Sequence, residues 1–137
     1  MSVEISTARG AARSRVEAFY RTQLGRDVPL ENDQHVLVAR DGEKIVAVLR
    51  LCPEAGTMLL RTVVVAKDRR GEGIGRSLLA AASQAIGPGE CWCFPWSYLE
   101  HFYAEIGLLR VPDASVPMAL RHRTNAECIA TYRTATA

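Results

Sequence analysis

The middle of the chain carries short runs of mostly apolar residues separated by turn residues, as buried β-strands do. Residues 35–40 and 45–52 carry this pattern, and Asp41-Gly42-Glu43-Lys44 lies between them. An Asp-Gly turn between two such runs is typical of a β-hairpin. A second turn at residues 53–56 leads into another apolar run at residues 57–65. The pattern therefore predicts three consecutive antiparallel strands.

Nearer the N-terminus, apolar residues recur at helical spacing instead. Residues 3–5 are β-prone and predict a first strand, after which Ser6 or Thr7 can cap a helix over residues 8–24. Gly25 stands where such a helix would stop. The apolar positions that recur at helical spacing are Ala12, Val16, Phe19, Tyr20 and Leu24. The arginines of the other face are interpreted as a solvated surface and are Arg9, Arg13, Arg15 and Arg21.

A strand, a glycine-rich turn and a helix follow one another at the centre of the chain. The strand ends with residues 59–65, the charged turn spans residues 69–75, and a helix is expected over residues 76–86. Gly87-Pro88-Gly89 stops that helix, and residues 90–94 predict a short strand. Strand, helix and strand in this order imply a right-handed crossover between parallel strands, so the predicted sheet is mixed.

The C-terminal third is less regular. We expect a helix over residues 98–106, an extended stretch at residues 108–111, a short helical turn near Ser115 and Pro117, and a closing strand at residues 128–133. No internal repeat, low-complexity tract or linker divides the sequence. The prediction is therefore a single domain over residues 1–137.

Composition narrows the class of protein. Of the 137 residues 48% are apolar, yet no apolar run is long enough to cross a bilayer or to serve as an N-terminal signal core. A cytoplasmic protein that binds no membrane is expected. The formal net charge of +2 gives no indication of nucleic-acid binding. The four cysteines form no C-x-x-C pair, so buried, reduced thiols are expected and no metal site.

The glycine-rich turn has the chemistry of a phosphate cradle. Gly71, Gly73 and Gly75 have no Cβ, so the backbone can adopt positive φ and turn successive N–H groups toward an anion. The helix that follows adds unpaired N–H groups and the positive end of its dipole. A tight turn without a ligand is the alternative interpretation. The nearby cations are Lys67, Arg69, Arg70 and Arg76.

The order of residues in this turn excludes two other phosphate loops. It lacks the Gly-Lys-Ser/Thr of a Walker loop, and it departs from the G-x-G-x-x-G of dinucleotide sites. Arg70-Gly71-Glu72-Gly73-Ile74-Gly75 resembles the Arg-x-x-Gly-x-Gly acetyl-CoA loop of the GCN5-related N-acetyltransferase (GNAT) superfamily. The resemblance implies an α/β (α+β) fold, with a mixed, mostly antiparallel central sheet of about six to seven strands and helices on both faces.

A second segment carries the same resemblance. Leu99-Glu100-His101-Phe102-Tyr103-Ala104-Glu105-Ile106-Gly107-Leu108 resembles the family's F-Y-x-x-x-G-F segment, whose tyrosine points from its helix toward the thioester sulfur. Tyr103 matches that tyrosine. The two segments have the separation expected in the family, and the match runs over residues 36–108. The alternative for Tyr103 is an ordinary aromatic packed between helix and sheet.

The resemblance implies a transferase, namely an acetyl-CoA-dependent N-acetyltransferase (acyltransferase). Its acceptor would be the primary amine of a small-molecule or amino-acid-like substrate, which attacks directly. Acetyl-CoA would be the co-substrate and Tyr103 the general acid for the departing thiolate. A bulge before the glycine turn would free a backbone N–H for the acetyl carbonyl. The residues implied in cofactor binding are Val63, Val64, Val65, Arg70, Gly71, Glu72, Gly73, Ile74, Gly75 and Arg76.

The sequence departs from the family pattern at three points. Trp96 replaces an asparagine common before the second segment, and Leu108 replaces the phenylalanine after its glycine. The strand glutamate that serves several members as general base is missing. The base could instead be a water chain or a helix residue, or the amine could arrive deprotonated. The helix residues considered are His101, Glu105 and Glu100, and for His101 and Glu105 surface positions are the simpler interpretation.

Two sets of residues bear on the acceptor. Arg50 and Arg61 lie on adjacent predicted strands, and a buried arginine needs an anionic partner. An acidic or carboxylate-bearing substrate is expected if both reach the acceptor pocket. The aromatic residues that could line this pocket, or equally belong to the core, are Trp92, Phe94, Trp96 and Tyr98.

Other functions stay open at this stage. A non-catalytic acyl-CoA-binding regulatory protein, which kept the loop and lost the base, is the alternative function. A nucleic-acid-binding module that uses the arginine face of the first helix ranks lower because the charge is balanced. Edge strands of such a sheet can pair between subunits, so a homodimer is an alternative to a monomer.

Overall fold

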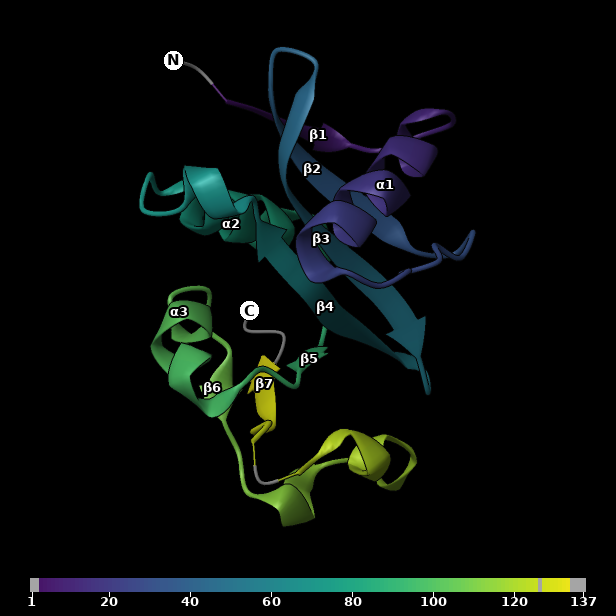
Figure 1. The fold of residues 1–137 in the computed structure, drawn as a ribbon. Coiled ribbons are helices and arrows are strands. Elements are labelled where there is room, and N and C mark those ends of the chain that lie inside the picture. Colours follow the sequence, from purple (N-terminus) through teal and green to yellow (C-terminus); the bar gives the residue numbers. More distant parts are fainter. Residues whose placement is uncertain (1–2, 126, 134–137) are drawn as a thin grey trace.

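A mixed seven-stranded sheet is the centre of the computed structural model, which describes residues 3–125 and 127–133 (Figure 1). The strand order is β1-β2-β3-β4-β5-β7-β6, and every neighbouring pair is antiparallel except β4 and β5. The predicted mixed, mostly antiparallel sheet and its parallel crossover are therefore confirmed. The strands are β1 (Glu4–Thr7), β2 (His35–Asp41), β3 (Lys44–Glu54), β4 (Thr57–Val65), β5 (Cys91–Cys93), β6 (Leu109–Arg110) and β7 (Thr131–Arg133).

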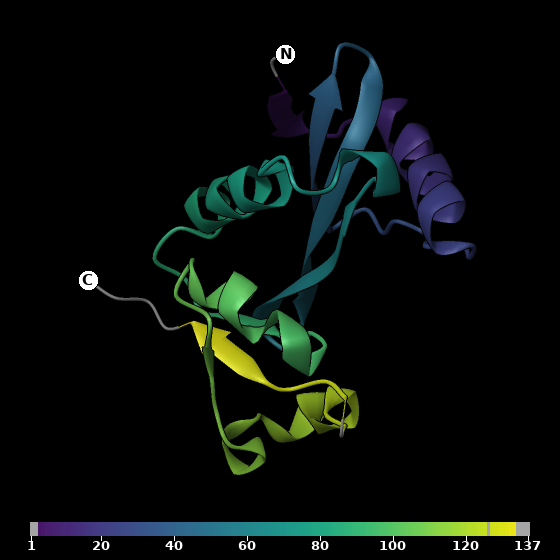
Figure 2. The same cartoon turned by 60° about the vertical axis from the view of Figure 1, so that its left-hand side comes forward.

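Helices cover both faces of the sheet, as predicted (Figures 1 and 2). Helix α1 (Ala12–Leu24) packs on one face, while α2 (Ile74–Ile86) and α3 (Glu100–Ala104) pack on the other. The remaining helical pieces are the 3-10 turns η1 (Lys67–Arg69), η2 (Ser97–Leu99), η3 (Asp113–Ser115) and η4 (Met118–Arg123).

The core is divided by the sheet. On one face the apolar side of α1 packs against β2 and β3, and on the other Leu78 and Leu79 of α2 pack against Leu49 and Leu60. A third cluster joins Leu59 and the C-terminal turns around Trp92. Burying an aliphatic side chain of this size contributes about 1.5–3 kcal/mol, so these clusters fix both helices on the sheet.

The helix boundaries differ from the prediction at their N-terminal ends. Helix α1 begins at Ala12, because Thr7 still belongs to β1 and Gly10 has a φ of +55° that a helix cannot continue through. Helix α2 begins at Ile74, two residues earlier than expected, with Gly73 as its left-handed N-cap. The predicted end of α1 is confirmed, since the Gly25 N–H donates to the Arg21 carbonyl.

The C-terminal elements are shorter than predicted. The helix expected over residues 98–106 is the turn η2 followed by α3, and the stretches at 108–111 and 128–133 pair only as β6 and β7. Residues 127–129 instead run beside residues 95–97, where the Ser97 N–H donates to Glu127 O and the Ile129 N–H donates to Pro95 O. This pairing continues the β5 edge without regular strand register.

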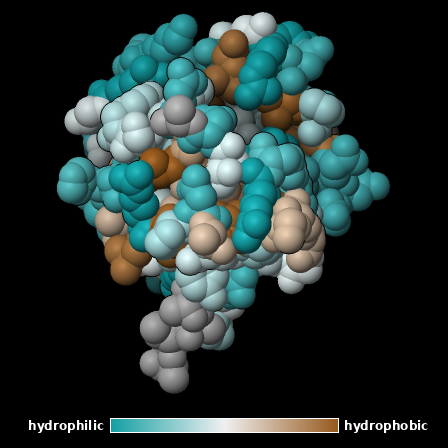
Figure 3. All heavy atoms as spheres, turned by 90° about the horizontal axis from the view of Figure 1, so that it is seen from below, coloured by the Kyte–Doolittle hydropathy of each residue, from teal (hydrophilic) through white to brown (hydrophobic). Residues whose placement is uncertain are grey.

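The surface at the lower end of Figure 1 is mainly hydrophilic, with apolar atoms in small separate groups (Figure 3). The exposed apolar side chains include Trp96, Leu109 and Met118. Within the described residues, no helix has the length and apolar character that crossing a membrane requires.

Candidate active site

A β-bulge interrupts β4 directly before the glycine turn. Val48 pairs with Val64 and Arg50 pairs with Arg61, so Thr62 and Val63 together oppose a single residue of β3. Thr62 has a φ of +53°, a left-handed conformation that is strained for a β-branched residue. Bulges of this kind re-aim the backbone beside active sites. The bulge predicted for this strand is therefore present, with Thr62 at its centre.

Two side chains hold the bulge from the α1 side. The Tyr20 hydroxyl donates to the Thr62 carbonyl at 2.7 Å, and Tyr20 is fully buried. Arg50, 5% exposed, donates from Nη2 and Nε to Thr62 Oγ1 at 2.7 and 3.2 Å, and from Nη1 to Gln34 Oε1 at 3.3 Å. These contacts stabilise the strained conformation.

Strands β4 and β5 separate just before the bulge. Their last pair is Leu60 with Cys93, whereas β4 continues to Val65. The gap forms a cavity of about 500 Å³. It is bounded by the β4 bulge, by Phe94, Pro95 and Trp96 after β5, by the end of α1, by α3 and by the C-terminal segment. The sheet therefore opens between these two strands, beside the bulge.

Tyr103 lines this cavity from the α2 side of the sheet and is 5% exposed. Burial, followed by the neighbouring Cys93 thiol, raises the pKa of the Tyr103 phenol well above its usual value near 10. The phenol is therefore held in its protonated form. Val63 and Val64 line the same cavity, so the bulged backbone and the tyrosine face a shared space.

The glycine turn follows the C-terminal end of β4. Gly71 and Gly73 both have a φ of +83°, and no atom would lie within 4 Å of a Cβ on either. The first hydrogen bond of α2 runs from the Ser77 N–H to Gly73 O at 3.1 Å, so the N–H groups of residues 74–76 have no partner within the helix. The turn thus has the backbone geometry of an anion cradle.

Gly75 has a different role from the other two glycines. It is already in α2, and a Cβ there would lie 3.3 Å from both Phe102 Cζ and Val65 Cγ2. The missing side chain lets α2 approach β4 and α3 closely. The N-terminus of the helix is thereby fixed beside the end of the bulged strand.

The charges around the turn are more compensated than the sequence suggested. Arg69 binds Asp41 at 3.0 Å and Glu72 at 3.0 Å. Arg76 pairs with Glu105 at 3.0 Å, while Arg70 donates to the Val65 carbonyl at 3.4 Å. Carboxylates therefore neutralise part of the positive charge that the sequence places at this end of α2.

The base candidates from the sequence lie outside the cavity. Glu105 is bound to Arg76, His101 is exposed, and neither these two nor Glu100 lines the space beside Tyr103. The structure places His122 there instead, 4.0 Å from Glu54. Nothing in the sequence pattern indicated it, because η4 reaches the cavity only through the tertiary fold.

Arg50 and Arg61 do share a face of the sheet, which the sequence could not establish. They are directly opposed in the β3–β4 register, but only Arg61 lines the cavity, because Arg50 is bound to the bulge. Arg26 and Arg123 join Arg61 there, and neither was singled out from the sequence. Of the aromatic candidates, Phe94 and Trp96 line the cavity, Trp92 is in the core, and Tyr98 is 78% exposed.

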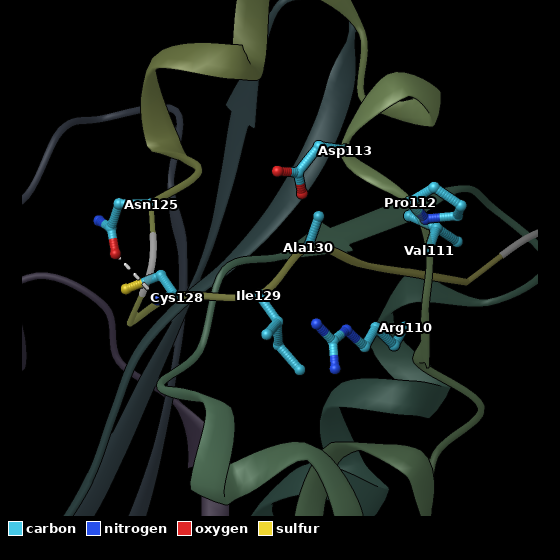
Figure 4. A pocket seen from close by; sticks show the side chains of 8 residues that line it. All are labelled: Arg110, Val111, Pro112, Asp113, Asn125, Cys128, Ile129 and Ala130. Atoms are coloured by element: carbon cyan, nitrogen blue, oxygen red, sulfur yellow. Dashed lines mark hydrogen bonds between the residues drawn. The ribbon is translucent and has the colours of Figure 1, made fainter.

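A second cavity of about 640 Å³ lies on the other side of the C-terminal segment (Figure 4). Asn125 and Cys128 line both cavities, and the Cys128 N–H donates to Asn125 Oδ1 at 2.9 Å. Arg110 and Asp113 are its charged residues. Neither the bulge nor Tyr103 borders this space, so it is not the candidate active site. Among the described residues, no group of histidine, cysteine or acidic side chains has the arrangement of a metal site.

Comparison with known proteins agrees with this geometry. A sequence model described as Acetyltransferase (GNAT) domain matches residues 32–107, which contain the bulge, the glycine turn and Tyr103. No curated protein matches the chain in sequence.

Several solved structures have the same fold. Escherichia coli ElaA superposes with a TM-score of 0.75 at 15% identity, over 96% of this chain and 99% of that one. An acyl-CoA N-acyltransferase from Pseudomonas aeruginosa gives 0.71 at 19% identity, over 97% and 100%. N-acetylglutamate synthase from Neisseria gonorrhoeae, solved with coenzyme A and N-acetyl-glutamate, gives 0.73 at 16% identity, over 100% of this chain and 36% of that one.

Proposed function

The chain belongs to the GNAT acetyltransferase family, and we propose that it transfers the acetyl group of acetyl-CoA to the primary amine of a small acceptor. One observation carries the proposal: the bulged backbone of β4 and the protonated phenol of Tyr103 face the same cavity between β4 and β5. Acyl transfer needs an oxyanion donor and an acid for the leaving group, and these two groups can supply them.

The cofactor is proposed to lie along the strand-turn-helix unit. The pyrophosphate would be bound by the backbone N–H groups of residues 71–76 and by the dipole of α2, with Arg70 and Arg76 nearby. The pantetheine arm would pass Val65, Val64 and Val63 and bring the thioester into the cavity. One structural relative was solved with coenzyme A, which supports this cofactor.

In the proposed reaction the amine nitrogen attacks the thioester carbonyl carbon. A backbone N–H of the bulge stabilises the oxyanion, the C–S bond breaks, and the sulfur takes the bonding electrons and the proton of Tyr103. The amine also loses a proton. His122, which lines the cavity beside Glu54, is the proposed acceptor of that proton in place of the missing strand glutamate.

The first experiment is calorimetric titration with acetyl-CoA of the wild-type protein and of a variant in which Gly73 and Gly75 are replaced by valine. We expect the wild type to bind and the variant to lose binding, because valine cannot adopt the left-handed φ of Gly73 and collides at Gly75. Absence of binding to the wild type would refute the proposal.

The second experiment measures release of the free thiol with a panel of primary amines. We expect Tyr103→Phe to lower kcat by about 10²–10⁴-fold with unchanged acetyl-CoA affinity, because only the proton donor is removed. Equal turnover by the two proteins would exclude Tyr103 as the general acid.

A non-catalytic acyl-CoA-binding regulator is the second candidate. It is favoured by one observation: none of the described residues that line the cavity is an aspartate or a glutamate. Binding of acetyl-CoA without turnover of any amine would support it, whereas turnover that Tyr103→Phe abolishes would exclude it.

A further inference from the structure

We propose that the acceptor carries a carboxylate in addition to its amine, and that Arg61 binds this carboxylate. This inference rests on the proposed acetyl transfer and assigns the class of its substrate. It concerns the α1 side of the cavity, opposite the side from which Tyr103 approaches.

Arg61 differs from Arg50 and Arg123 because it has no partner in the part of the chain that the structure describes. Arg50 is bound to Thr62 and Gln34, and Arg123 donates from Nε and Nη2 to the Glu54 carboxylate. Arg61 has neither a hydrogen bond nor an ion pair with any of the described residues, although it is only partly exposed and lines the cavity. A partly desolvated guanidinium without a partner is unfavourable, and an anionic ligand would compensate it.

The charges around Arg61 also favour an anionic ligand. Arg26 and Arg123 also line the cavity, and the described lining contains no carboxylate. Burial, followed by repulsion from Arg123 and Arg50, lowers the pKa of Arg61. Glu54 neutralises Arg123 from outside the lining, whereas Arg26 is exposed to solvent, which leaves Arg61 as the partly buried charge that no described residue compensates. A cavity with charge of one sign attracts ligands of the opposite sign.

The geometry favours a small amino acid over a larger anion. Arg61 directly precedes Thr62 and Val63, so its side chain starts from the backbone next to the bulge that would hold the acetyl carbonyl. The cavity of about 500 Å³ must also admit the thioester end of the cofactor. A guanidinium binds a carboxylate through two parallel hydrogen bonds, which would fix the acceptor and direct its amine toward the thioester.

The test uses pairs of acceptors that differ only in charge: β-alanine with β-alaninamide, and L-glutamate with L-glutamine. Binding to the CoA complex is measured by calorimetry, and turnover with acetyl-CoA by thiol release. Wild type is compared with Arg61→Gln, with Arg61→Lys, and with the control Arg110→Gln, which removes an exposed arginine outside this cavity. Acetyl-CoA binding by each variant verifies that it is folded.

We expect wild type and Arg110→Gln to prefer the carboxylate in at least one pair by about 10- to 100-fold. Arg61→Gln should lose that preference, and Arg61→Lys should recover part of it because it restores charge without the planar fork. Turnover that favours the neutral members, or a preference that survives Arg61→Gln, would overturn the inference and leave acetyl transfer intact. Carboxylate binding that depends on Arg61 without any turnover would support the inference and refute acetyl transfer. No binding of any carboxylate would overturn the inference.

Discussion

Thr62 connects the core to the chemistry of the site. Its φ of +53° costs about 1–2 kcal/mol for a residue with a Cβ, and such strain persists only where neighbours enforce it. Tyr20 and Arg50 are those neighbours, because one binds its carbonyl and the other its hydroxyl. Tyr20 comes from α1 and Arg50 from the neighbouring strand β3, so packing around these two residues determines where the β4 backbone points.

Replacing Thr62 by valine tests this connection. The change keeps the branched shape but removes Oγ1, which leaves the buried Arg50 with Gln34 as its remaining partner. We expect a loss of about 1–3 kcal/mol in the free energy of unfolding, measured in urea, together with weaker turnover. Thr62→Ser is the matched control, since it keeps the hydroxyl and should lose less than the valine variant. Equal losses would show that the hydroxyl is not what holds the bulge.

The protonation of Tyr103 leads to a second prediction at the scale of a single residue. Because burial and Cys93 raise its pKa, the phenol stays protonated throughout the range in which activity can be measured. Any alkaline loss of kcat should therefore come from another group. The pH profile of Tyr103→Phe should keep the wild-type shape at a level about 10²–10⁴-fold lower. An alkaline limb that disappears in Tyr103→Phe would assign it to this phenol.

Among the elements, the contact of α2 with β4 and α3 is the most constrained. Gly75→Ala adds a Cβ that would lie 3.3 Å from Phe102 and from Val65 on two different elements. We expect it to destabilise the fold by about 1 kcal/mol, despite the helix propensity of alanine, and to weaken acetyl-CoA binding by displacing the helix. Urea unfolding and calorimetry measure the two effects.

Phe102→Leu distinguishes this collision from backbone strain. Combined with Gly75→Ala, it should recover part of the acetyl-CoA affinity because it removes Cζ. It should recover none in Gly73→Ala, where the cost of about 1–2 kcal/mol comes from the left-handed φ and not from a contact. A rescue of both variants, or of neither, would contradict this distinction.

The turn η4 is attached to the end of β3 by one ion pair. Arg123 binds the Glu54 carboxylate, and this hydrogen bond is the main reason that the pKa of Glu54 is lowered. A carboxyl whose pKa is lower in the folded state stabilises the fold above its unfolded value of about 4.3, and this contribution is lost as the pH falls toward the folded pKa.

Glu54→Gln should therefore lower the free energy of unfolding by about 1 kcal/mol near neutral pH and by less at about pH 3. Urea titrations at both pH values measure the difference, and Glu4→Gln, which removes an exposed carboxylate, is the control. A loss that is the same at both pH values would mean that the ion pair is not its cause.

At the scale of the whole molecule, the sequence predicted the elements whose pattern is local. The apolar runs of β2, β3 and β4, the left-handed Gly25 at the end of α1 and the parallel crossover through α2 all follow from neighbouring residues. The left-handed Thr62 does not, because no propensity favours it and only Tyr20 and Arg50 enforce it.

For the candidate site too, the sequence predicted only the residues that lie in contiguous motifs. The glycine turn and Tyr103 lie in contiguous motifs, whereas Arg26, His122 and Arg123 reach the cavity from segments far apart in the sequence. The register of β3 and β4 decides that Arg50 and Arg61 share a face, and a one-residue shift would have separated them. The positive charge on the acceptor side of the cavity therefore comes from residues that only the tertiary fold brings together.

Buried acids that are neutral in the folded state make the fold sensitive to alkali. Burial raises the pKa of the Cys91 thiol to about 11 and raises the pKa of Cys93, Tyr20 and Tyr103 further still. Each group stabilises the fold fully below its unfolded pKa, about 8.5 for a thiol and about 10 for a phenol, and this contribution is lost as the pH rises toward the folded value. Urea midpoints should therefore fall progressively above about pH 8.5. Cys91→Ala should make that fall shallower, while Tyr98→Phe, which removes an exposed phenol, should follow the wild type. A midpoint that stays constant to about pH 10 would mean that these thiols ionise as readily in the folded protein as in the unfolded chain.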